Sequence, residues 1–516
     1  MRLEHFASKA VGRTASISMT SGFWILVSAG LAAVLAVVLA IEIPSLALLA
    51  AFAAVVAVAL FVAPKLAVGS LALFLVLQSA LVNIVGGQAT SLGLAFQRVD
   101  EAMVVAASLR IAVFLGWRDL HVELERWVYW VTAFLAAGMV SSTFAHVPIA
   151  TSILGAFLAV KFSVFFLLAL TIKWDDADAA RVVQTALTLG PLVLGIGVLL
   201  LVLPPEASRL FVDPSADPSL DVQAFLARGG LQSMHGPFVH PGVFGWAMAV
   251  VGCYAIARLV TQPSLLGGVA LLSSVVGIVA SLRRKPLVAL PVAVLVYVFW
   301  ARTRRQRLGI LVLLLVLVIG VGLIGRDRVK TVVDSTMTSY LDPYSPTTAR
   351  SLLYFTGWRI AKEHFPLGAG FGRFGGYISQ IHYSPLYDHY GLSGVYGLSR
   401  ETPMYLQDTY WPHIVGETGV LGALVLVAFF FQLWRRSLRV ATTSLNSHRR
   451  ALAVAASMVL VEGMVESAAT PVFEISLLAY TIAIPLGITL VLGKRPVEVP
   501  HLLGSELLGE SVREGQ

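Results

Sequence analysis

Long apolar runs alternate with short polar connectors along most of the 516-residue chain. A helix that crosses a bilayer needs about 20 largely apolar residues, and runs of about 17 to 22 such residues recur here. We therefore predict an all-α fold, a polytopic bundle of about 12 to 14 transmembrane helices. The predicted spans are 22–42, 44–62, 66–84, 101–116, 127–144, 150–172, 182–203, 242–260, 265–281, 286–301, 308–325, 413–433, 451–469 and 472–492.

One long polar segment interrupts this alternation. It covers residues 326–412, is rich in Gly and Tyr, and carries Arg, His and Asp side chains together. Within it, residues 345–366 predict a helix with Ser345 as the N-cap and Pro346 in the first turn, and the helix is expected to end at Pro366. Long loops on a rigid scaffold often carry function, so we expect the activity to reside here.

Composition and charge support a membrane protein. Hydrophobic residues make up 57% of the chain, charged residues 13%, and the mean hydropathy is +0.82, which excludes a soluble globular protein. The net charge is +8. Because Lys and Arg lie in short clusters between spans, we expect no nucleic-acid partner. The single cysteine, Cys253, excludes an intrachain disulfide.

The basic clusters fall in alternate connectors, which predicts an orientation because Lys and Arg resist translocation. The apolar run 23–41 is longer than a signal-peptide core, so we expect an uncleaved first span. The predicted division is a cytoplasmic N-terminus at 1–21, helices 1–11 at 22–325 with an external loop at 204–241, a large external loop at 326–412, the last spans at 413–492, and a cytoplasmic tail at 493–516.

Three cations break the charge rule. Arg283, Arg284 and Lys285 fall in a very short connector that the predicted topology places outside. Either a span is miscounted, or these cations face an anionic ligand at the outer membrane surface, such as a lipid diphosphate.

Two motifs match known binding sites only in part. Gly370, Gly372 and Gly375 have the spacing of a dinucleotide fingerprint, but no strand precedes them and no acidic partner follows, so we expect tight turns instead. His235 and His240 are five residues apart, whereas helical metal ligands usually lie three or four apart, and no third ligand is evident. We therefore predict no metal and a structural or hydrogen-bonding role for both histidines.

Charged residues within predicted spans need partners, because a lone charge in lipid is costly. Glu462 and Glu466 share one helix face. They are either proton-relay carboxylates of a transporter or counter-ions for Arg110, Lys161 or the external arginines. We favour the counter-ion interpretation.

The segment QDTYWPHIVGETGVLG (407–422) ends the loop and begins the next span. Asp408 lies just before that span. It is either a solvated or helix-capping residue, or a general base that deprotonates a hydroxyl beside a cation-bound leaving group.

At these residues the chain resembles the O-antigen ligase and polymerase superfamily, the Wzy and WaaL type of bacterial envelope glycosyltransferase. The resemblance covers about residues 225–425. The segments that carry it are, in order, GPFVHPGVFGW, SLRRKPL, GWRIAKEH with FPLGAGFGRFGG, and QDTYWPHIVGETGVLG.

The resemblance implies a multi-pass enzyme of the bacterial inner (plasma) membrane. Such enzymes polymerise or ligate undecaprenyl diphosphate-linked oligosaccharide units on the periplasmic side, for O-antigen or exopolysaccharide synthesis. It implies metal-independent transfer with no cofactor. The implied partners are the lipid-linked glycan donor, a glycan acceptor, membrane lipids and other polysaccharide assembly proteins.

The resemblance also implies roles for individual residues. A family histidine that activates the acceptor falls in register with Asp408, and His413 comes five residues later, so both are candidate catalytic residues. This departure favours a polymerase-like member over a lipid A core ligase. The candidate diphosphate-binding residues are Arg228, Arg283, Arg284, Arg350, Arg359 and Arg373. The candidate sugar-binding residues, which also suit an aromatic belt at the interface, are Tyr405, Tyr410 and Trp411.

Two other functional classes fit part of the pattern. A secondary transporter or lipid-linked sugar flippase would explain the many spans and the buried charges. Against it, the sequence has no matched pair of Gly- or Pro-broken helices in two halves, and transporter sites lie near the midplane rather than in one large loop. A non-catalytic membrane scaffold is the third possibility.

Overall fold

The structure is a computed structural model that describes residues 44–85, 90–115, 121–212, 226–228, 231–300 and 348–494. Within these ranges it has 17 α-helices, one 3-10 helix and one pair of two-residue strands. The predicted spans 22–42 and 308–325 lie outside the described residues. The elements are α2 (Pro44–Val62), α3 (Pro64–Ile84), α4 (Ser91–Gln97), α5 (Val99–Leu115), α6 (His121–Phe144), α7 (Ile149–Ala159), α8 (Lys161–Leu170), α9 (Asp176–Val202), η2 (Pro205–Leu210), β1 (Ala227–Arg228), β2 (Leu231–Gln232), α11 (Pro241–Thr261), α12 (Leu265–Ala280), α13 (Arg284–Trp300), α16 (Ala349–Glu363), α17 (Tyr377–Ile381), α18 (Pro385–His389), α19 (Trp411–Thr443), α20 (Ser447–Glu466) and α21 (Ser476–Leu492).

The predicted all-α membrane fold is confirmed. Among the described residues, five helices are long and apolar enough to cross a membrane, namely α3, α6, α9, α11 and α19. A sixth span results if α7 and α8, which are bent by 53° relative to each other, are counted together. Other predicted spans are shorter apolar helices, such as α12 and α21. The count for the described residues is lower than the predicted one because two predicted spans lie outside these residues, and because apolar windows do not reveal where a helix breaks or ends.

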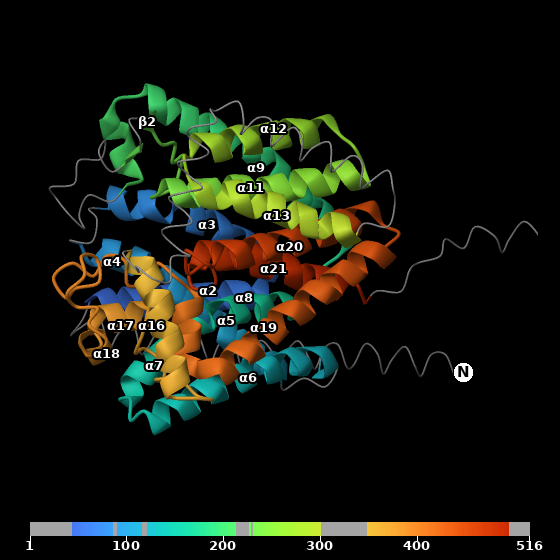
Figure 1. The fold of residues 1–516 in the computed structure, drawn as a ribbon. Helices are drawn as coiled ribbons and strands as arrows, with labels where there is room; N and C mark the ends of the chain where they lie inside the picture. The colour runs from blue at the N-terminus through green and yellow to red at the C-terminus, as the bar shows by residue number, and fades with distance from the viewer. Residues whose placement is uncertain are drawn as a thin grey trace, which may run out of the picture.

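The helix α20 lies at the centre of the bundle. It packs against α11, α13 and α19, and Figure 1 shows it with α21 between α11 and α19. Residues 451–460 of α20 are all buried. Small side chains bring other helices close together: Gly252 of α11 lies against Ser274 of α12, whose hydroxyl donates to the Met248 carbonyl at 2.6 Å.

Charged side chains buried among the helices have partners on neighbouring helices. Lys161 Nζ, just after the bend between α7 and α8, lies 3.0 Å from Asp100 Oδ2 and 3.7 Å from Glu101 Oε1. Arg110 Nε donates to Thr171 Oγ1 at 2.8 Å. These contacts provide the compensation that a buried charge requires.

Glu462 and Glu466 were predicted to be counter-ions for Arg110, Lys161 or the external arginines, and the first two of these cations have other partners. Lys161 pairs with Asp100 of α5, and Arg110 donates to Thr171 at the end of α8. Helical periodicity alone does not identify these partners. Glu466 instead acts electrostatically on Lys285. The counter-ion role thus applies to a cation of the 283–285 cluster.

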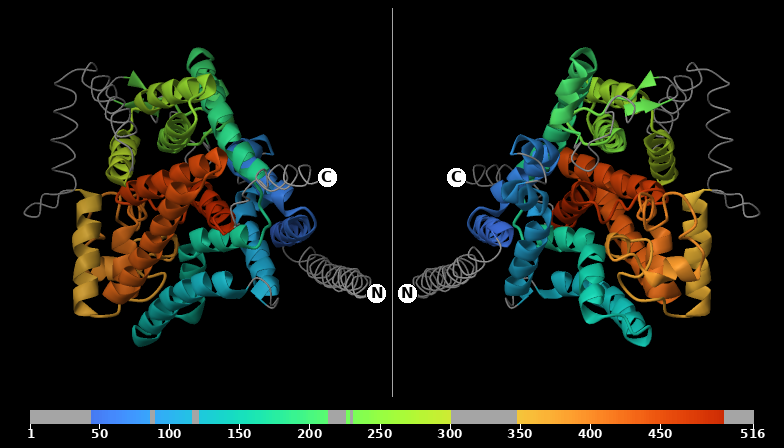
Figure 2. Two further views of the ribbon diagram at one scale, coloured as in Figure 1. Left: turned by 90° about the vertical axis from the view of Figure 1, so that its right-hand side faces the viewer. Right: turned by 90° about the vertical axis from the view of Figure 1, so that its left-hand side faces the viewer.

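The described part of the large loop has its own small core. Figure 1 shows α16 nearly perpendicular to α20 and α21 at their left-hand ends, and Figure 2 places it at the edge of the bundle. Its N-cap is Thr348, whose hydroxyl accepts from Ser351 N at 3.3 Å. The predicted N-cap, Ser345, lies with Pro346 outside the described residues, and the helix begins at Ala349 instead. The core residues are Leu353, Ile360, Ala369, Phe374, Tyr383, Tyr387, Leu392, Leu398 and Leu406.

A kink in α19 attaches this loop to the bundle. Gly419 has φ 69° and ψ −171°, so the helical path is interrupted there. The loop segment 366–370 runs along the interruption and bonds to it through its backbone. The bonds are Ala369 N to Gly416 O at 2.8 Å, Gly370 N to Glu417 O at 2.9 Å, and Leu421 N to Pro366 O at 3.2 Å.

We predict that Gly419→Ala destabilises the protein. An alanine Cβ would lie 2.2 Å from the carbonyl carbon of Leu367, and the positive φ disfavours any side chain. The expected loss is at least about 2 kcal/mol, measured as a lower Tm of the purified protein. The control is Gly69→Ala in α3, where no atom lies within 4 Å of the added Cβ. Equal melting temperatures for the two variants would contradict the kink's role.

Candidate functional site

Several predicted site residues converge at the end of the bundle where the loop is attached. The convergence involves the turn between α12 and α13, the start of α16, the segment just before α19, and the turn after α20. The charges of Arg350, Glu466, Asp408 and Arg283 all act on the ammonium group of Lys285. Sequence positions more than 180 residues apart are thus gathered around one cation.

Lys285 is held by the turn that follows α20. Its ammonium group donates to the carbonyl oxygen of Ala469 and to the hydroxyl of Thr470. The preceding turn is sharp, because Leu282 has a φ of 51°, which is uncommon for a residue other than glycine. The Ser281 hydroxyl supports this turn by accepting from Arg283 N at 3.2 Å. Local geometry therefore places Lys285 against the turn that follows α20.

Asp408 forms an ion pair with the start of α16. Arg350 Nη2 donates to Asp408 Oδ2 at 2.7 Å, and the two side chains are 33% and 30% exposed. Asp408 does not cap α19, because the N-cap residue is Tyr410 and it makes no side-chain capping bond. The carboxylate is thus oriented by a guanidinium group and remains accessible, as a general base requires.

His413 is committed to other protein groups. Its side chain is buried, Nδ1 lies 2.8 Å from the Phe374 carbonyl oxygen, and Nε2 lies 2.9 Å from Glu474 Oε1. A carbonyl oxygen only accepts, so Nδ1 carries a proton, and any lone pair on Nε2 faces the Glu474 carboxylate. The ring therefore offers no lone pair to a substrate hydroxyl in this arrangement. These contacts give His413 a structural role, and its catalytic role stays a prediction.

The other arginines do not all join the cluster. Arg359 is nine residues after Arg350 on α16, which places it on the opposite helix face. It pairs with Glu363 at 2.8 Å and lies over the Tyr390 ring. The hydrogen bond from the Tyr390 hydroxyl, followed by the bond from Arg359, lowers the pKa of Glu363. Arg359 is therefore separated from the Lys285 cluster.

Three further arginines have different placements. Arg284 begins α13, beside Arg283 in the cationic turn. Arg373 lies in the Gly-rich loop segment near Glu417, and burial lowers the pKa of its guanidinium group. Arg228 is in β1, paired with Leu231 across the short hairpin, and its side chain lies outside the described residues. Their diphosphate-binding roles stay predictions.

The aromatic candidates are also placed differently from one another. Tyr405 is exposed. Trp411 is half-buried and donates from Nε1 to Ser467 Oγ at 2.8 Å. Tyr410 is fully buried and packs against Phe473, so it has no ring face to offer a sugar. Tyr410 thus has a packing role, and the sugar-binding roles of the three aromatic residues stay predictions.

Sequence reasoning missed the importance of the turn after α20. This turn binds Lys285 and accepts two further hydrogen bonds. The Tyr354 hydroxyl donates to the Ala468 carbonyl oxygen at 2.7 Å, and Tyr410 N donates to the Ser467 carbonyl oxygen at 3.2 Å. The feature of the sequence that pointed to this turn was Glu466, a charged residue near the end of an apolar run.

The two predicted metal candidates have structural partners. His235 contacts Phe238 O at 3.0 Å and Ser208 Oγ at 3.1 Å. His240 caps α11, accepting from Gly242 N at 2.9 Å. The structural interpretation of both histidines is confirmed. No group of three or more His, Cys, Asp or Glu side chains able to hold a metal occurs among the described residues.

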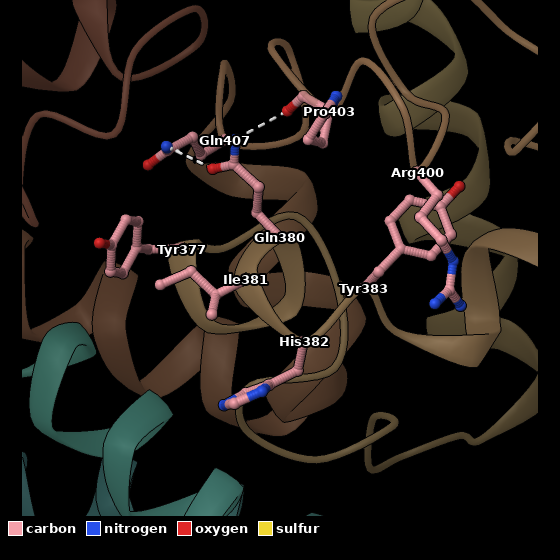
Figure 3. A pocket seen from close by; sticks show the side chains of 8 residues that line it. All are labelled: Tyr377, Gln380, Ile381, His382, Tyr383, Arg400, Pro403 and Gln407. Atoms are coloured by element: carbon pink, nitrogen blue, oxygen red, sulfur yellow. Dashed lines mark hydrogen bonds between the residues drawn. The ribbon is translucent and has the colours of Figure 1, made fainter. Parts of the chain in front are cut away.

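A pocket of about 540 Å³ opens on the loop beside the Asp408 segment. Figure 3 shows its lining side chains, including Gln380 and Tyr377 of α17 and Gln407 of the loop exit. Gln407 immediately precedes Asp408 in the chain. The pocket and the ion pair therefore share one short stretch of backbone.

Residues 269–396 match the Wzy_C family, which is described as O-antigen ligase. The matched stretch contains the cationic turn 283–285, α16 and α17, and it ends before Asp408. This match confirms the resemblance inferred from the sequence motifs. No curated protein matches the chain.

We predict that His413→Ala lowers stability, because the largely buried Glu474 carboxylate would lose the ring that lies 2.9 Å from it. Loss of one partner of a buried ion pair costs about 3 to 5 kcal/mol, which should appear as a large decrease in Tm. His382→Ala, at an exposed histidine, should leave Tm unchanged. A stable His413→Ala protein that specifically lacks activity would instead restore the catalytic assignment.

Proposed function

Because residues 269–396 form a Wzy_C O-antigen ligase domain, we propose that the chain is a membrane glycosyltransferase. It polymerises or ligates oligosaccharide units carried on undecaprenyl diphosphate, on the periplasmic side of the bacterial inner membrane. The observation that carries the proposal is the gathering of Arg283, Arg350 and Asp408 around Lys285, with Asp408 accessible and paired to Arg350.

The cations suit the leaving group of this reaction. When the bond between the anomeric carbon and the diphosphate oxygen breaks, the electron pair stays on that oxygen. Guanidinium and ammonium groups fixed in advance stabilise this developing charge, and arginine does so with bidentate hydrogen bonds. Arg350 is paired with Asp408, and Lys285 is positioned by Ala469 and Thr470.

Asp408 suits activation of the acceptor. As the acceptor oxygen bonds to the anomeric carbon, its proton passes to the Asp408 carboxylate. The ion pair with Arg350 orients this carboxylate next to the leaving-group cations. An aspartate in the register of the family histidine also supports a polymerase-like enzyme over a lipid A core ligase.

One observation favours the alternative of a transporter. The bend between α7 and α8, with buried Lys161 beside it, resembles the broken helices that form transporter sites. However, Asp100 and Glu101 already neutralise Lys161. Proton-coupled uptake of a substrate by proteoliposomes that contain only this protein would support transport.

We predict that Asp408→Asn reduces glycan transfer about 10² to 10⁴-fold, because it removes the proposed general base. Cells with this variant should accumulate lipid-linked repeat units, measured by mass spectrometry of lipid extracts, with normal amounts of the protein in the membrane. Asp388→Asn, at an exposed carboxylate of α18, is the matched control and should make normal polymer. Normal polymer from Asp408→Asn would refute the assignment of the base.

We also predict a pH dependence from Lys285, which lies just before the predicted span 286–301. Burial, followed by the charge of Arg350, lowers the pKa of Lys285 to about 8. The ammonium group is charged below this pH and neutral above it, so kcat/KM for the lipid-linked donor should fall as pH rises through about 8. Lys285→Arg should move the fall to higher pH. Lys362→Arg, at an exposed lysine, should leave the profile unchanged, and an unmoved profile in Lys285→Arg would exclude Lys285 as its source.

A further inference from the structure

We infer that the loop pocket lined by Gln380 and Gln407 is the subsite for the acceptor glycan. This inference rests on the proposed function and assigns one of its two substrates to a specific place. The pocket lies next to the proposed base, since Gln407 lines the pocket and Asp408 follows it directly. An acceptor held there would present a hydroxyl group close to the Asp408 carboxylate.

The lining chemistry fits a glycan. The pocket combines side-chain amides, phenol rings and one guanidinium group, and none of its lining residues is Asp, Glu or Lys. Amides both donate and accept, which matches the paired donor and acceptor character of sugar hydroxyls. Exposed tyrosine such as Tyr377 offers an apolar ring edge or face to a sugar. The pocket volume of about 540 Å³ lies within the range of ordinary ligand sites.

The polar groups are held in place before any ligand binds. Gln407 Nε2 donates to Gln380 Oε1 at 2.6 Å, and Gln380 Nε2 donates to Pro403 O at 2.8 Å, as drawn in Figure 3. Across the pocket, Arg400 lies over the Tyr383 ring, and Tyr383 OH donates to the Leu398 carbonyl oxygen at 3.0 Å. Fixed donors and acceptors bind a ligand at a lower entropic cost.

The amide pair retains hydrogen-bonding capacity for a ligand. Each NH₂ group has two donors, and these contacts use one donor of Gln380 and one of Gln407. No hydrogen bond from the described residues reaches the carbonyl oxygen of Gln407. The remaining groups are therefore available to several sugar hydroxyls at once.

The pocket is distinct from the proposed diphosphate site. The residues that line it do not include Arg283, Lys285 or Arg350. Asp408 connects the two regions, because it pairs with Arg350 and directly follows Gln407 in the chain. On this inference, the donor and acceptor sites have separate lining residues and adjoin one short stretch of backbone, residues 407–408. This separation is what transfer between two large substrates requires.

The test measures binding to the full-length protein in detergent micelles. The probe is a set of short oligosaccharides cut from the host strain's own polysaccharide after release from lipid by mild acid. Wild type and the inactive Asp408→Asn variant should bind them with similar Kd. Gln407→Leu and Gln380→Leu should each raise Kd about tenfold, as expected when polar contacts to the ligand are lost.

The matched control is Gln262→Leu, at an exposed glutamine after α11, which should bind like wild type. In transfer assays, the Gln407→Leu variant should raise the KM for the acceptor and leave the KM for the lipid-linked donor unchanged. A protein that merely misfolded would lose donor turnover as well.

The outcomes separate the two proposals. Unchanged Kd in both pocket variants, or no binding of the oligosaccharides by wild type, would overturn the acceptor subsite. Loss of transfer in Asp408→Asn would still support the proposed glycosyltransferase in that case. Normal transfer by Asp408→Asn would count against the proposed mechanism whatever the binding data show.

Discussion

The arrangement of the site depends on the backbone hydrogen bonds at the kink in α19. In a continuous helix, most carbonyl groups accept from the N–H group four residues later. Where Gly419 interrupts the helix, the carbonyl groups of Gly416 and Glu417 accept from the loop segment 369–370. Buried backbone groups are costly to leave unpaired, so these bonds fix the position of the loop relative to the bundle.

His413 and Glu417 extend this attachment from the backbone to side chains. Glu417 Oε1 accepts from Phe374 N at 2.8 Å, while the Phe374 carbonyl oxygen faces the His413 ring. The same ring contacts Glu474, in the connection between α20 and α21. Loop, kinked helix and connection are therefore joined beneath the surface. The accessible pair of Arg350 and Asp408 is left out of this structural network.

Sequence patterns predicted the architecture and part of the site. Apolar periodicity gave the all-α membrane fold, and unusual placement of charge identified Arg283, Lys285 and Asp408. Helical spacing alone also predicts that Arg350 and Arg359 lie on opposite faces of their helix. Nine residues make about two and a half turns. The burial of His413 and Tyr410 was not predictable, because it depends on the Gly419 kink and on the turn after α20, and neither contact leaves a periodic signal.

The attachment of the loop to the bundle allows each of them to hold one substrate. On the proposed function, Lys285 belongs to the bundle, at the start of α13, and positions the leaving diphosphate, whereas Gln380 and Gln407 belong to the loop and position the acceptor. Holding two reactants in fixed relation lowers the barrier only if their supports do not move relative to each other. The kink at Gly419 provides that rigidity through backbone bonds, which persist when side chains change. Specificity for different glycans could then change in the pocket while the diphosphate site and its connection to Asp408 stay the same.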